Sequence, residues 1–353
     1  MTVYCGVDFH ARQQTICYCD SRDGEIKRCE LRHEGNQVGA FYAQFTGVVI
    51  VGLEASGYCN WFEELLEEMG HKVWLGNPSE IRRKAPRRQK NDRRDAELIL
   101  QLMLKGDFPR LFRFSAESRL VLRQLRYRQK LVKVRTIARN SVQAISLNAG
   151  LSLKRSLWSR RGRERLQALE LPPVLAAQRE EWLQLITQFD QRIAVIESSL
   201  TELAAKDEKI TLLRTHPGIG LLTSLALRHT LEPVTRFPTS RKVVAYVGLD
   251  PVENSSAERH VTGGISKQGS RLLRFLLNEA GQIACRQDPD LKRFYGRLVH
   301  RRNRPKAKVA VARKLLVRSF IMLRDQIDYA EFVRRGVAVR SARKVHRPEV
   351  PVP

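Results

Sequence analysis

Two carboxylates stand at the ends of apolar runs in the first part of the chain. Asp8 ends a strand-like segment that covers residues 2–8, and Glu54 follows the continuous apolar run at residues 48–53. A short apolar run without polar interruption is typical of a strand that is buried on both faces. Because adjacent strands of one sheet end at the same edge, we expect Asp8 and Glu54 to lie close together.

Asp92 and Asp95 complete a set of four acids, at the start of an expected helix over residues 91–104. Side chains three positions apart project from the same face of a helix. Four converging carboxylates suit two divalent cations that activate an attacking oxygen and stabilise a leaving one. Oxygen ligands without His or Cys favour Mg²⁺ or Mn²⁺. Taken singly, the acids could instead be a strand-end cap, a buried ion-pair partner and helix N-terminal residues favoured by the dipole.

The charge of the chain indicates a polyanionic partner. It has 63 Lys and Arg residues against 37 Asp and Glu residues, which gives a net charge of +26. Each contact between a basic side chain and a phosphate releases condensed counterions, so this excess favours a nucleic-acid partner over a generally solvated surface. We expect no membrane partner, because no stretch approaches the roughly 20 apolar residues of a membrane span.

Basic residues gather in two places where they could hold phosphates. The first group precedes Asp92 and comprises Arg82, Arg83, Lys84, Arg87, Arg88 and Lys90. The second group lies on an expected helix over residues 117–146 and comprises Arg123, Arg126, Arg128, Lys130, Lys133, Arg135 and Arg139. Few acidic residues accompany the second group in sequence, which favours nucleic-acid binding over a merely solvated helix face.

A second compact region is expected over residues 208–335. It opens with Gly218 and Gly220 in the segment His-Pro-Gly-Ile-Gly, which is similar to half of a helix-hairpin-helix. Glycine N–H groups in such a segment can approach a phosphate at a helix N-terminus. A simple turn between two helices explains the two glycines equally well.

Serine residues in a polar segment follow farther along the second region. Ser255 and Ser256 lie in an expected loop over residues 253–257. Serines in polar loops are usually plain loop residues, so their type alone assigns them no role. A basic segment that could contact nucleic acid comes next and contains Lys267, Arg271 and Arg274.

The elements that must position the four acids alternate between strands and helices. Strand-like segments are expected at residues 2–8, 14–20, 25–31, 48–53 and 71–75, and helices at residues 35–45 and 61–69 and from residue 77. This order, β-β-β-α-β-α-β-α, is that of the RNase H-like (RuvC-like) nucleases. We therefore expect an α/β domain of this class over residues 1–112, although other three-layer folds share parts of the order.

The middle of the chain, residues 113–207, is expected to be a helical connector. Apolar residues at alternating spacings of three and four indicate a short coiled-coil seam, formed by Ile186, Phe189, Ile193, Ile196, Leu200 and Leu203. The prolines at positions 172 and 173 separate two helical runs, so we expect an antiparallel helical hairpin. The second region is expected to be mainly α-helical, and residues 336–353 form a basic, Pro-rich tail.

The cysteines and the N-terminus suggest a cytoplasmic protein. Six cysteines are scattered along the chain, and no second pair or His cluster completes a zinc site around Cys17 and Cys19. We interpret them as reduced thiols. The first residues continue directly into a strand pattern, without the features of a signal peptide.

Several motifs together resemble a known family. They are Gly6-Val7-Asp8, Leu53-Glu54-Ala55-Ser56-Gly57-Tyr58, Asn77-Pro78 and Asn91-Asp92-Arg93-Arg94-Asp95-Ala96. In this combination the chain resembles, over nearly its whole length, the DEDD insertion-sequence transposases of the IS110 family, and its spacing is closer to the IS1111 subgroup. The resemblance implies a homo-oligomeric (dimeric or tetrameric) DNA recombinase that acts on double-stranded donor and target DNA and is guided by a structured RNA from the element.

The resemblance also implies a role for one serine. The family carries a Pro, a short loop with Ser-Gly, and an Ile-Ser-Lys-x-Gly segment before a basic helix, and the loop serine takes the DNA phosphate as a covalent ester. Counting from Pro251 and from Lys267 places that serine at Ser256. Ala257 stands where the family usually has Gly, so Ser255 stays a second candidate. In the family, metals held by the acidic domain activate the serine, with the two domains meeting across subunits.

Two rival functions use the same residues differently. In a RuvC-like, junction-resolving endonuclease the four acids would activate water, and the second region would only grip DNA. In a non-catalytic nucleic-acid-binding protein the acids would have structural roles. Covalent protein–DNA adducts separate the first rival from a serine recombinase, and metal-dependent strand cleavage excludes the second.

Overall fold

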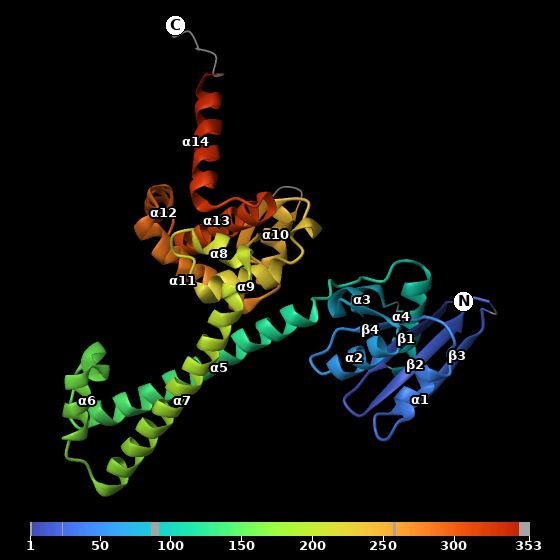
Figure 1. Cartoon of the computed structure of the whole chain (residues 1–353), viewed down its shortest axis with the longest axis horizontal. Coiled ribbons are helices and arrows are strands. Elements are labelled where there is room, and N and C mark those ends of the chain that lie inside the picture. The colour runs from blue at the N-terminus through green and yellow to red at the C-terminus, as the bar shows by residue number, and fades with distance from the viewer. Residues whose placement is uncertain (1, 23, 86–91, 257–258, 346–353) are drawn as a thin grey trace. The chain divides into compact units, whose positions relative to one another are not determined.

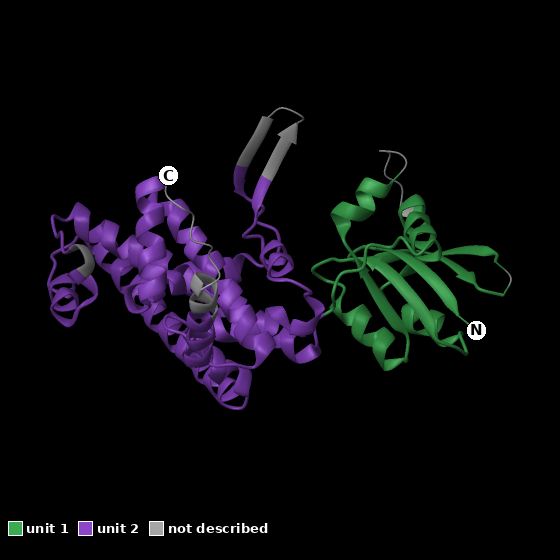
Figure 2. Cartoon of the chain, turned by 90° about the horizontal axis from the view of Figure 1, so that it is seen from above, with its two compact units in different colours: residues 1–113 green, residues 114–353 purple. Residues whose placement is uncertain are grey.

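The computed structural model describes residues 2–22, 24–85, 92–256 and 259–345. Side chains are described for these residues except 92, 154–155, 253–256, 259–262 and 339–345. The chain divides into two compact units, Met1–Arg113 and Phe114–Pro353 (Figure 2). The helices expected as a connector therefore belong to the second unit. None of the described helices has both the length and the apolar content needed to cross a bilayer.

The first unit contains a mixed five-stranded sheet (Figure 1). Its strands are β1 (Val3–Phe9), β2 (Gln13–Asp20), β3 (Ile26–Arg32), β4 (Val49–Glu54) and β5 (Lys72–Gly76). They lie in the order β3-β2-β1-β4-β5, in which β1, β4 and β5 are parallel while β2 is antiparallel to both of its neighbours. The succession of strands and helices is the one expected from the sequence.

Helices cover both faces of this sheet. They are α1 (Gln37–Ala43), α2 (Asn60–Glu68), α3 (Pro78–Lys84) and α4 (Asp92–Leu104). Val7 and Leu53 share one buried cluster with Tyr42 of α1 and Phe62 of α2. The alternate residues of β1 and β4 face α4 on the other side. Burial of both faces explains why β4 reads as a continuous apolar run.

The backbone of α4 lies directly on β1, and Gly6 permits this close approach. A Cβ atom at position 6 would stand 2.4 Å from the carbonyl oxygen of Ala96 and 2.5 Å from the amide nitrogen of Leu100. Both neighbours are backbone atoms that cannot rotate away. Gly52, beside Gly6 in the register of β1 and β4, leaves room for the side chain of Met103 in the same way.

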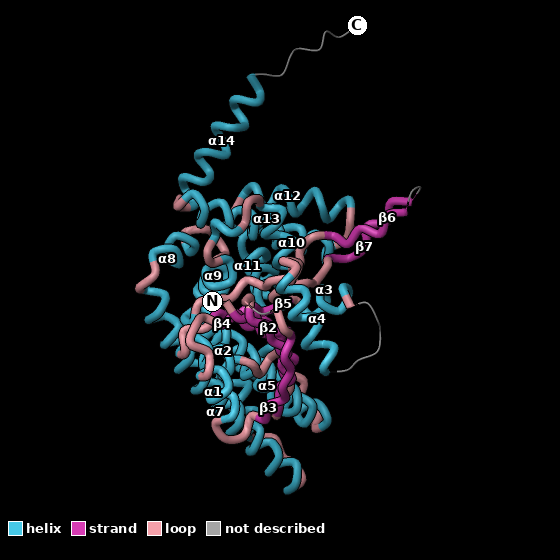
Figure 3. The backbone as a smooth tube through the Cα atoms, turned by 90° about the vertical axis from the view of Figure 1, so that its right-hand side faces the viewer, coloured by secondary structure: helices cyan, strands magenta, loops and turns pink. Residues whose placement is uncertain are grey.

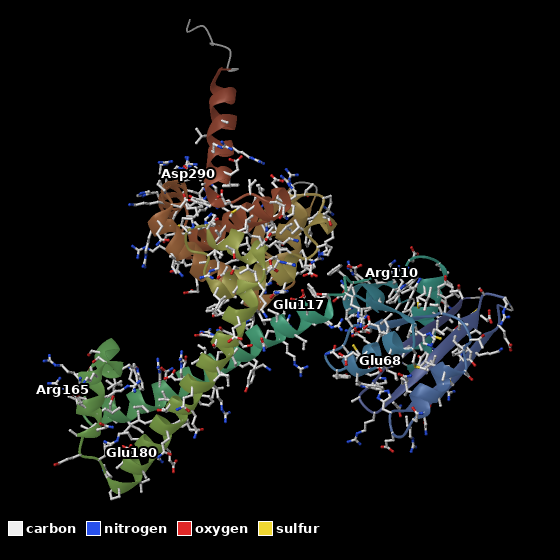
Figure 4. The ribbon with its side chains drawn as sticks, viewed as in Figure 1. Glu68, Arg110, Glu117, Arg165, Glu180 and Asp290 are labelled. Atoms are coloured by element: carbon white, nitrogen blue, oxygen red, sulfur yellow. The ribbon has the colours of Figure 1, made fainter. Side chains whose placement is uncertain are left out.

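The second unit begins with a pair of long helices. These are α5 (Ala116–Asn148) and α7 (Pro173–Ala205), with the short elements η1 (Lys154–Trp158) and α6 (Arg160–Gln167) between them. Ile186, Ile193 and Leu200 of the expected seam are buried, and α7 begins at the expected proline. The turn that carries η1 and α6 was not expected from the sequence. Arg165 on α6 lies at the end of the pair that is distant from the helical body (Figure 4).

A helical body completes the second unit. Its elements are α8 (Glu208–Arg214), α9 (Leu221–Leu231), η2 (Val234–Arg236), α10 (Ser240–Val247), α11 (Arg271–Gln287), α12 (Pro289–Arg301), α13 (Arg304–Asp325) and α14 (Tyr329–Val345). One large apolar cluster joins α5, α8, α9, α10, α11 and α13. A two-stranded hairpin of β6 (Pro251–Ser256) and β7 (Arg259–Ile265) projects from this body (Figure 3).

A buried polar network ties several helices of this body together. Arg318 of α13 forms an ion pair with Asp288, and the hydroxyl of Tyr329 donates a hydrogen bond to Asp288 Oδ2 at 2.7 Å. The ring of His216 lies against that of Tyr329 at an interplanar angle of 59°, with the ring centroids 4.6 Å apart. Its Nδ1 lies 2.8 Å from the carbonyl oxygen of Pro217 and its Nε2 lies 3.4 Å from the guanidinium of Arg318. This arrangement fits a neutral imidazole that donates through Nδ1 and accepts through Nε2.

We predict that Gly6→Ala destabilises the first unit by about 1–3 kcal/mol, the usual cost of overpacking a core. The added methyl group would push the backbone of α4 away from β1, so amides of both elements should exchange faster with deuterium. Gly57→Ala is the matched control, because a Cβ atom there would meet nothing within 4 Å. Equal exchange in the two variants would contradict the close-approach explanation.

We also predict that the second unit loses stability in mild acid. Burial lowers the pKa of His216 from its usual value near 6.5 to about 4. The unfolded chain therefore binds a proton that the folded chain rejects, so the contribution is complete above pH 6.5 and falls as the pH drops toward 4. The free energy of unfolding should be lower by about 2 kcal/mol at pH 5 than at pH 7.

Urea titrations followed by circular dichroism at both pH values test this pH dependence. His216→Gln should remove most of the difference between pH 7 and pH 5, because the variant has no imidazole at this position to protonate. His300→Gln is the control, since it removes an exposed imidazole from α12 of the same unit. A pH dependence that survives in His216→Gln would assign the acid sensitivity to another group.

Candidate functional site

Asp8 and Glu54 lie side by side at one edge of the sheet. Parallel strands β1 and β4 pair in a register that places Val7 opposite Leu53, so the next positions are the two acids. Both carboxylates belong to the face that α4 covers, because Val7 and Leu53 point into the cluster on the other face. The side chain of Asp8 is 17% exposed, so it is accessible but held by its surroundings.

The start of α4 lies near the same end of the sheet. Arg93 pairs with Glu30 of β3 at 3.3 Å, in the row of the sheet that contains Thr15 and Asp8. Farther along α4, Leu100 packs with residues from the opposite end of β1 and β2. The first turn of α4, with Asp92 and Asp95, therefore lies at the end of the sheet where the two strand-end acids lie.

Asp95 lies on the side of α4 that faces β4. It shares a helix face with Ile99 and Leu102, four and seven positions later, and these two pack in a cluster with residues of β4 and β5. Asp95 is half-buried. Asp92 is the first residue of the helix, and its side chain lies outside the described residues.

His10 is a neighbour of the site that the sequence did not indicate. Its Nε2 lies 3.2 Å from Oδ2 of Asp8, within hydrogen-bond distance. An Asp-x-His spacing is common in proteins and carries little signal by itself. In the structure the contact helps to orient the Asp8 carboxylate, since Asp8 lies near the end of β1 and His10 directly follows the strand.

The donor set suits a hard divalent cation by its chemistry. Asp8 and Glu54 at the edge of the sheet and Asp95 on α4 carry carboxylate oxygens, the ligands that Mg²⁺ and Mn²⁺ prefer. Within the part of the chain whose side chains are described, no three His, Cys, Asp or Glu residues are close enough together to hold a metal ion. Asp92 was expected as the fourth ligand and lies outside that part.

The basic residues before Asp92 are only partly described. Arg87, Arg88 and Lys90 lie outside the described residues. Arg82 is exposed on α3, and the Nζ of Lys84 donates a hydrogen bond to the carbonyl oxygen of Asp107 at 2.7 Å. Among the described cations of this segment, Arg82 is therefore better suited to contact a phosphate than Lys84.

Ser255 and Ser256 lie in strand β6, not in the loop that we expected. Their backbones pair with His260 and Arg259 of β7. Segments of mostly polar composition can still pair as a short two-stranded ribbon, and their composition alone does not reveal this pairing. The side chains of both serines lie outside the described residues.

A polar clamp holds the base of this hairpin. The hydroxyl of Ser266 donates a hydrogen bond to Oδ1 of Asp250 at 2.5 Å, and the two backbones bond at 2.9 Å. Gly248 has a φ of +76° and approaches the backbone of Gln268 so closely that a Cβ atom would stand 2.1 Å from its carbonyl oxygen. The direction of the hairpin is thus set by the packing of its first and last residues.

The expected nucleic-acid residues after the hairpin differ in their surroundings. Lys267 and Arg271 are exposed, and Lys267 adopts a left-handed backbone with a φ of +57°. Arg274 donates a hydrogen bond to the carbonyl oxygen of Val247 at 2.9 Å, and desolvation lowers the pKa of its guanidinium. Arg274 therefore closes the C-terminal end of α10, whereas Lys267 and Arg271 are available at the surface.

The two expected phosphate-binding glycines also differ. Gly218 has a φ of +88° and packs on α11, where a Cβ atom would stand 2.6 Å from the carbonyl oxygen of Ala280. Gly220 is exposed at the start of α9, and a Cβ atom there would meet nothing within 4 Å. Packing accounts for Gly218, and the predicted phosphate contact of either glycine stays a prediction.

The basic face of α5 separates into two groups. Arg128 donates a hydrogen bond to Glu197 of α7 at 2.9 Å, and Arg135 and Arg139 both pair with Asp190. The later residue on α5, Arg135, pairs with the earlier residue on α7, Asp190, as is expected of two antiparallel helices. The other four expected residues are exposed: Arg123, Arg126, Lys130 and Lys133.

Comparison with known proteins connects both units to one group of enzymes. A model of IS110-type DEDD transposases, described as "Transposase", matches residues 5–147, and a model described as "Transposase IS116/IS110/IS902 family" matches residues 210–296. The chain is 28% identical over 280 residues to the transposase for insertion sequence element IS1111A of Coxiella burnetii, which covers 75% of this chain and 74% of that protein. It is 28% identical over 323 residues to a probable family 20 transposase of Pseudomonas aeruginosa, which covers 88% of this chain and 89% of that protein.

The matched segments contain the residues described above. The first match covers Asp8, Glu54, Asp92 and Asp95, and the second covers the hairpin with Ser256. A third relative, the transposase for insertion sequence element IS1328 of Yersinia enterocolitica, is also 28% identical and covers 66% of this chain and 70% of that protein. By the edge of acids in its first unit and by these matches, the chain belongs to the IS110 family of DEDD transposases.

Proposed function

We propose that the protein moves an insertion sequence by cutting and rejoining DNA, with the four acids and Ser256 as its reactive groups. The observation that carries the proposal is the position of Asp8, Glu54 and the first turn of α4 at the same end of the sheet. Family membership supports it, because both matched segments contain proposed reactive residues. The strand order supports an RNase H-like, or RuvC-like, fold for the first unit.

Asp8, Glu54, Asp92 and Asp95 would hold Mg²⁺ or Mn²⁺. When bound, such a cation supplies positive charge that activates an attacking oxygen and stabilises a leaving one. The chain itself provides a rigid edge for the carboxylates, because β1 and β4 are central strands with both faces buried. His10 contributes by orienting the carboxylate of Asp8.

Ser256 would act as the nucleophile toward a DNA phosphate. Its oxygen forms a bond to phosphorus, the bond from phosphorus to the leaving sugar oxygen breaks, and that oxygen takes up a proton while the serine loses one. A sugar hydroxyl of another strand then reverses these bonds and regenerates the serine. Each step exchanges one phosphate ester for another, so rejoining needs no additional energy source. The acids and the serine belong to separate compact units, so the reaction needs a first and a second unit, from one chain or from two, to be brought together.

The partners we propose are double-stranded DNA and a structured RNA from the element, bound by a homo-oligomer. The exposed residues Arg123, Arg126, Lys130 and Lys133 of α5 support a polyanion on the second unit. The paired residues Arg128, Arg135 and Arg139 contribute to the seam between α5 and α7 instead. Their charge is already partly neutralised by α7.

We predict that Asp8→Asn, Glu54→Gln or Asp95→Asn lowers DNA strand cleavage in Mg²⁺ at least about a hundredfold, the upper end of what changes around a metal site cost. Each substitution removes a negative charge with little change in shape. DNA binding should stay nearly unchanged in filter-binding assays, because Lys and Arg carry it. Glu34→Gln, an exposed residue of the same unit, is the control. Full cleavage by one variant removes that residue from the proposed metal site.

We predict that Ser256→Ala forms no covalent DNA adduct and no recombinant product. The change deletes one hydroxyl group, and its cost to the free energy of unfolding should be within roughly 0.5 kcal/mol. Adducts that survive denaturation in detergent provide the measurement. Consecutive strand positions lie on opposite faces of a ribbon, so Ser255→Ala is a matched control and should keep most of the activity.

The outcomes of this experiment separate the rival mechanisms. Loss of activity in Ser255→Ala with full activity in Ser256→Ala would move the nucleophile by one position and keep the mechanism. Recombination by the double variant would exclude a serine nucleophile. Cleavage without any adduct, together with loss of cleavage in the acid variants, would favour a structure-specific endonuclease that uses water.

A further inference from the structure

A cluster of aromatic rings lies at the same edge of the sheet as Asp8 and Glu54. We call it the aromatic patch, and it consists of Phe9, His33, Tyr58, Trp61 and Phe62. Phe9 follows Asp8 at the end of β1, and Tyr58 lies in the segment that connects Glu54 to α2. The patch is on the face of α1 and α2, opposite to the face of the acids.

Two rings of the patch are exposed, and buried rings support them from below. Tyr58 is 56% exposed and Trp61 is 41% exposed, whereas Phe9 is 7% exposed. The ring centroid of Phe9 lies 6.3 Å from that of Tyr58, 5.9 Å from that of Trp61 and 5.3 Å from that of the buried Phe62.

His33 completes the support of Trp61. Its ring stacks on Phe9 at 4.8 Å and meets Trp61 edge-on at 4.9 Å. Desolvation lowers the pKa of His33, so the ring is neutral near pH 7 and packs as an uncharged aromatic. Rings held in this way lose little rotational freedom when a ligand binds, which lowers the entropic cost of binding.

The chemistry of the patch selects its occupant. Single exposed apolar residues are ordinary, but two supported aromatic rings at an edge with reactive acids form a stacking surface. A second copy of the chain is a poor occupant, because a stable protein interface needs on the order of 1,000 Å² and the exposed part of the patch is only two side chains. An unpaired nucleobase offers a flat face of matching size, and bases of any sequence stack on aromatic rings of this kind.

We propose that Tyr58 and Trp61 stack an unpaired nucleobase of the nucleic-acid strand that lies at the acidic edge. This inference rests on the proposed function for the choice of edge, since the strand that carries the base would pass the end of the sheet where Asp8 and Glu54 lie. Stacking outside the duplex would compensate for part of the cost of unpairing a base, which is a few kcal/mol for a duplex step. Strands with a mismatch or a single-stranded segment should therefore bind better than fully paired DNA.

Binding of the full-length protein to labelled DNA tests the proposal. The probes are a single-stranded oligothymidylate, a duplex with one mismatched base and the fully paired duplex, with Ca²⁺ in place of Mg²⁺, and fluorescence anisotropy gives the affinity. Tyr58→Ala and Trp61→Ala should each weaken binding to the first two probes about tenfold, a typical loss for one stacked base. Binding to the paired duplex should change less than about threefold.

Matched variants separate stacking from charge and from loss of folding. Tyr58→Phe and Trp61→Phe keep a ring and should bind like the unaltered protein, and Tyr127→Ala removes an exposed tyrosine from α5 as a control. Because stacking releases no counterions, the alanine variants should keep the slope of log affinity against log salt concentration. A flatter slope would indicate lost phosphate contacts and would overturn the stacking role.

Photochemical cross-linking provides an independent readout. An oligothymidylate with one 5-iodouracil should cross-link to Tyr58 or Trp61, as mapped by mass spectrometry of the digested protein. Unchanged affinity in both alanine variants, or an absence of cross-links to these rings, overturns the proposal. A change of oligomeric state in Tyr58→Ala or Trp61→Ala without a change in affinity would assign the patch to a second copy of the chain. None of these readouts needs strand cleavage or Ser256, so the proposed function can fail while the stacking site stands.

Discussion

The contact between the backbone of α4 and β1 at Gly6 sets how closely Asp95 on α4 can lie to Asp8 on β1. With no side chain at Gly6, the turn of α4 from Ala96 to Leu100 rests on the strand itself. A side chain here would raise the helix and move its first turn away from Asp8. The carboxylates on β1 and on α4 therefore depend on one another through a contact that contains no carboxylate. This gives the glycine two residues before Asp8 a structural reason, the close approach of α4.

Some of the basic side chains of the second unit stabilise its fold, and others are exposed at its surface. Arg128 spans from α5 to α7, and Arg274 closes the end of α10 on backbone carbonyls. Arg318 lies inside the buried network with Asp288. These guanidinium groups already have hydrogen-bond acceptors, so a phosphate would have to displace a partner in order to bind. A count of Lys and Arg residues thus overestimates the number of cations that nucleic acid can reach.

The sequence predicted those features that depend on local periodicity. The buried strand that ends at Glu54 and the start of α7 at Pro173 were both predicted, because a continuous apolar run and a proline act on their own segments. The partner of Arg128 was not predicted, since Glu197 is 69 residues away and only the fold brings them together. The strand that contains Ser256 was also missed, because its polar composition is typical of loops. The backbone pairing with β7 makes this segment a strand although its residues have low intrinsic β-strand propensity.

The position of the hairpin that carries Ser256 depends on the packing at its base, around Gly248 and Ser266. A lone two-stranded ribbon is marginally stable in water, so its position depends on what holds its base. Here Ser266 bonds to Asp250, and Gly248 lets the chain fold tightly against the segment that follows the hairpin. The direction of such a ribbon, and with it the position of Ser256, depends on these contacts at its base. Asp8 and Glu54, in contrast, lie on central strands of the first unit, whose two buried faces fix their positions.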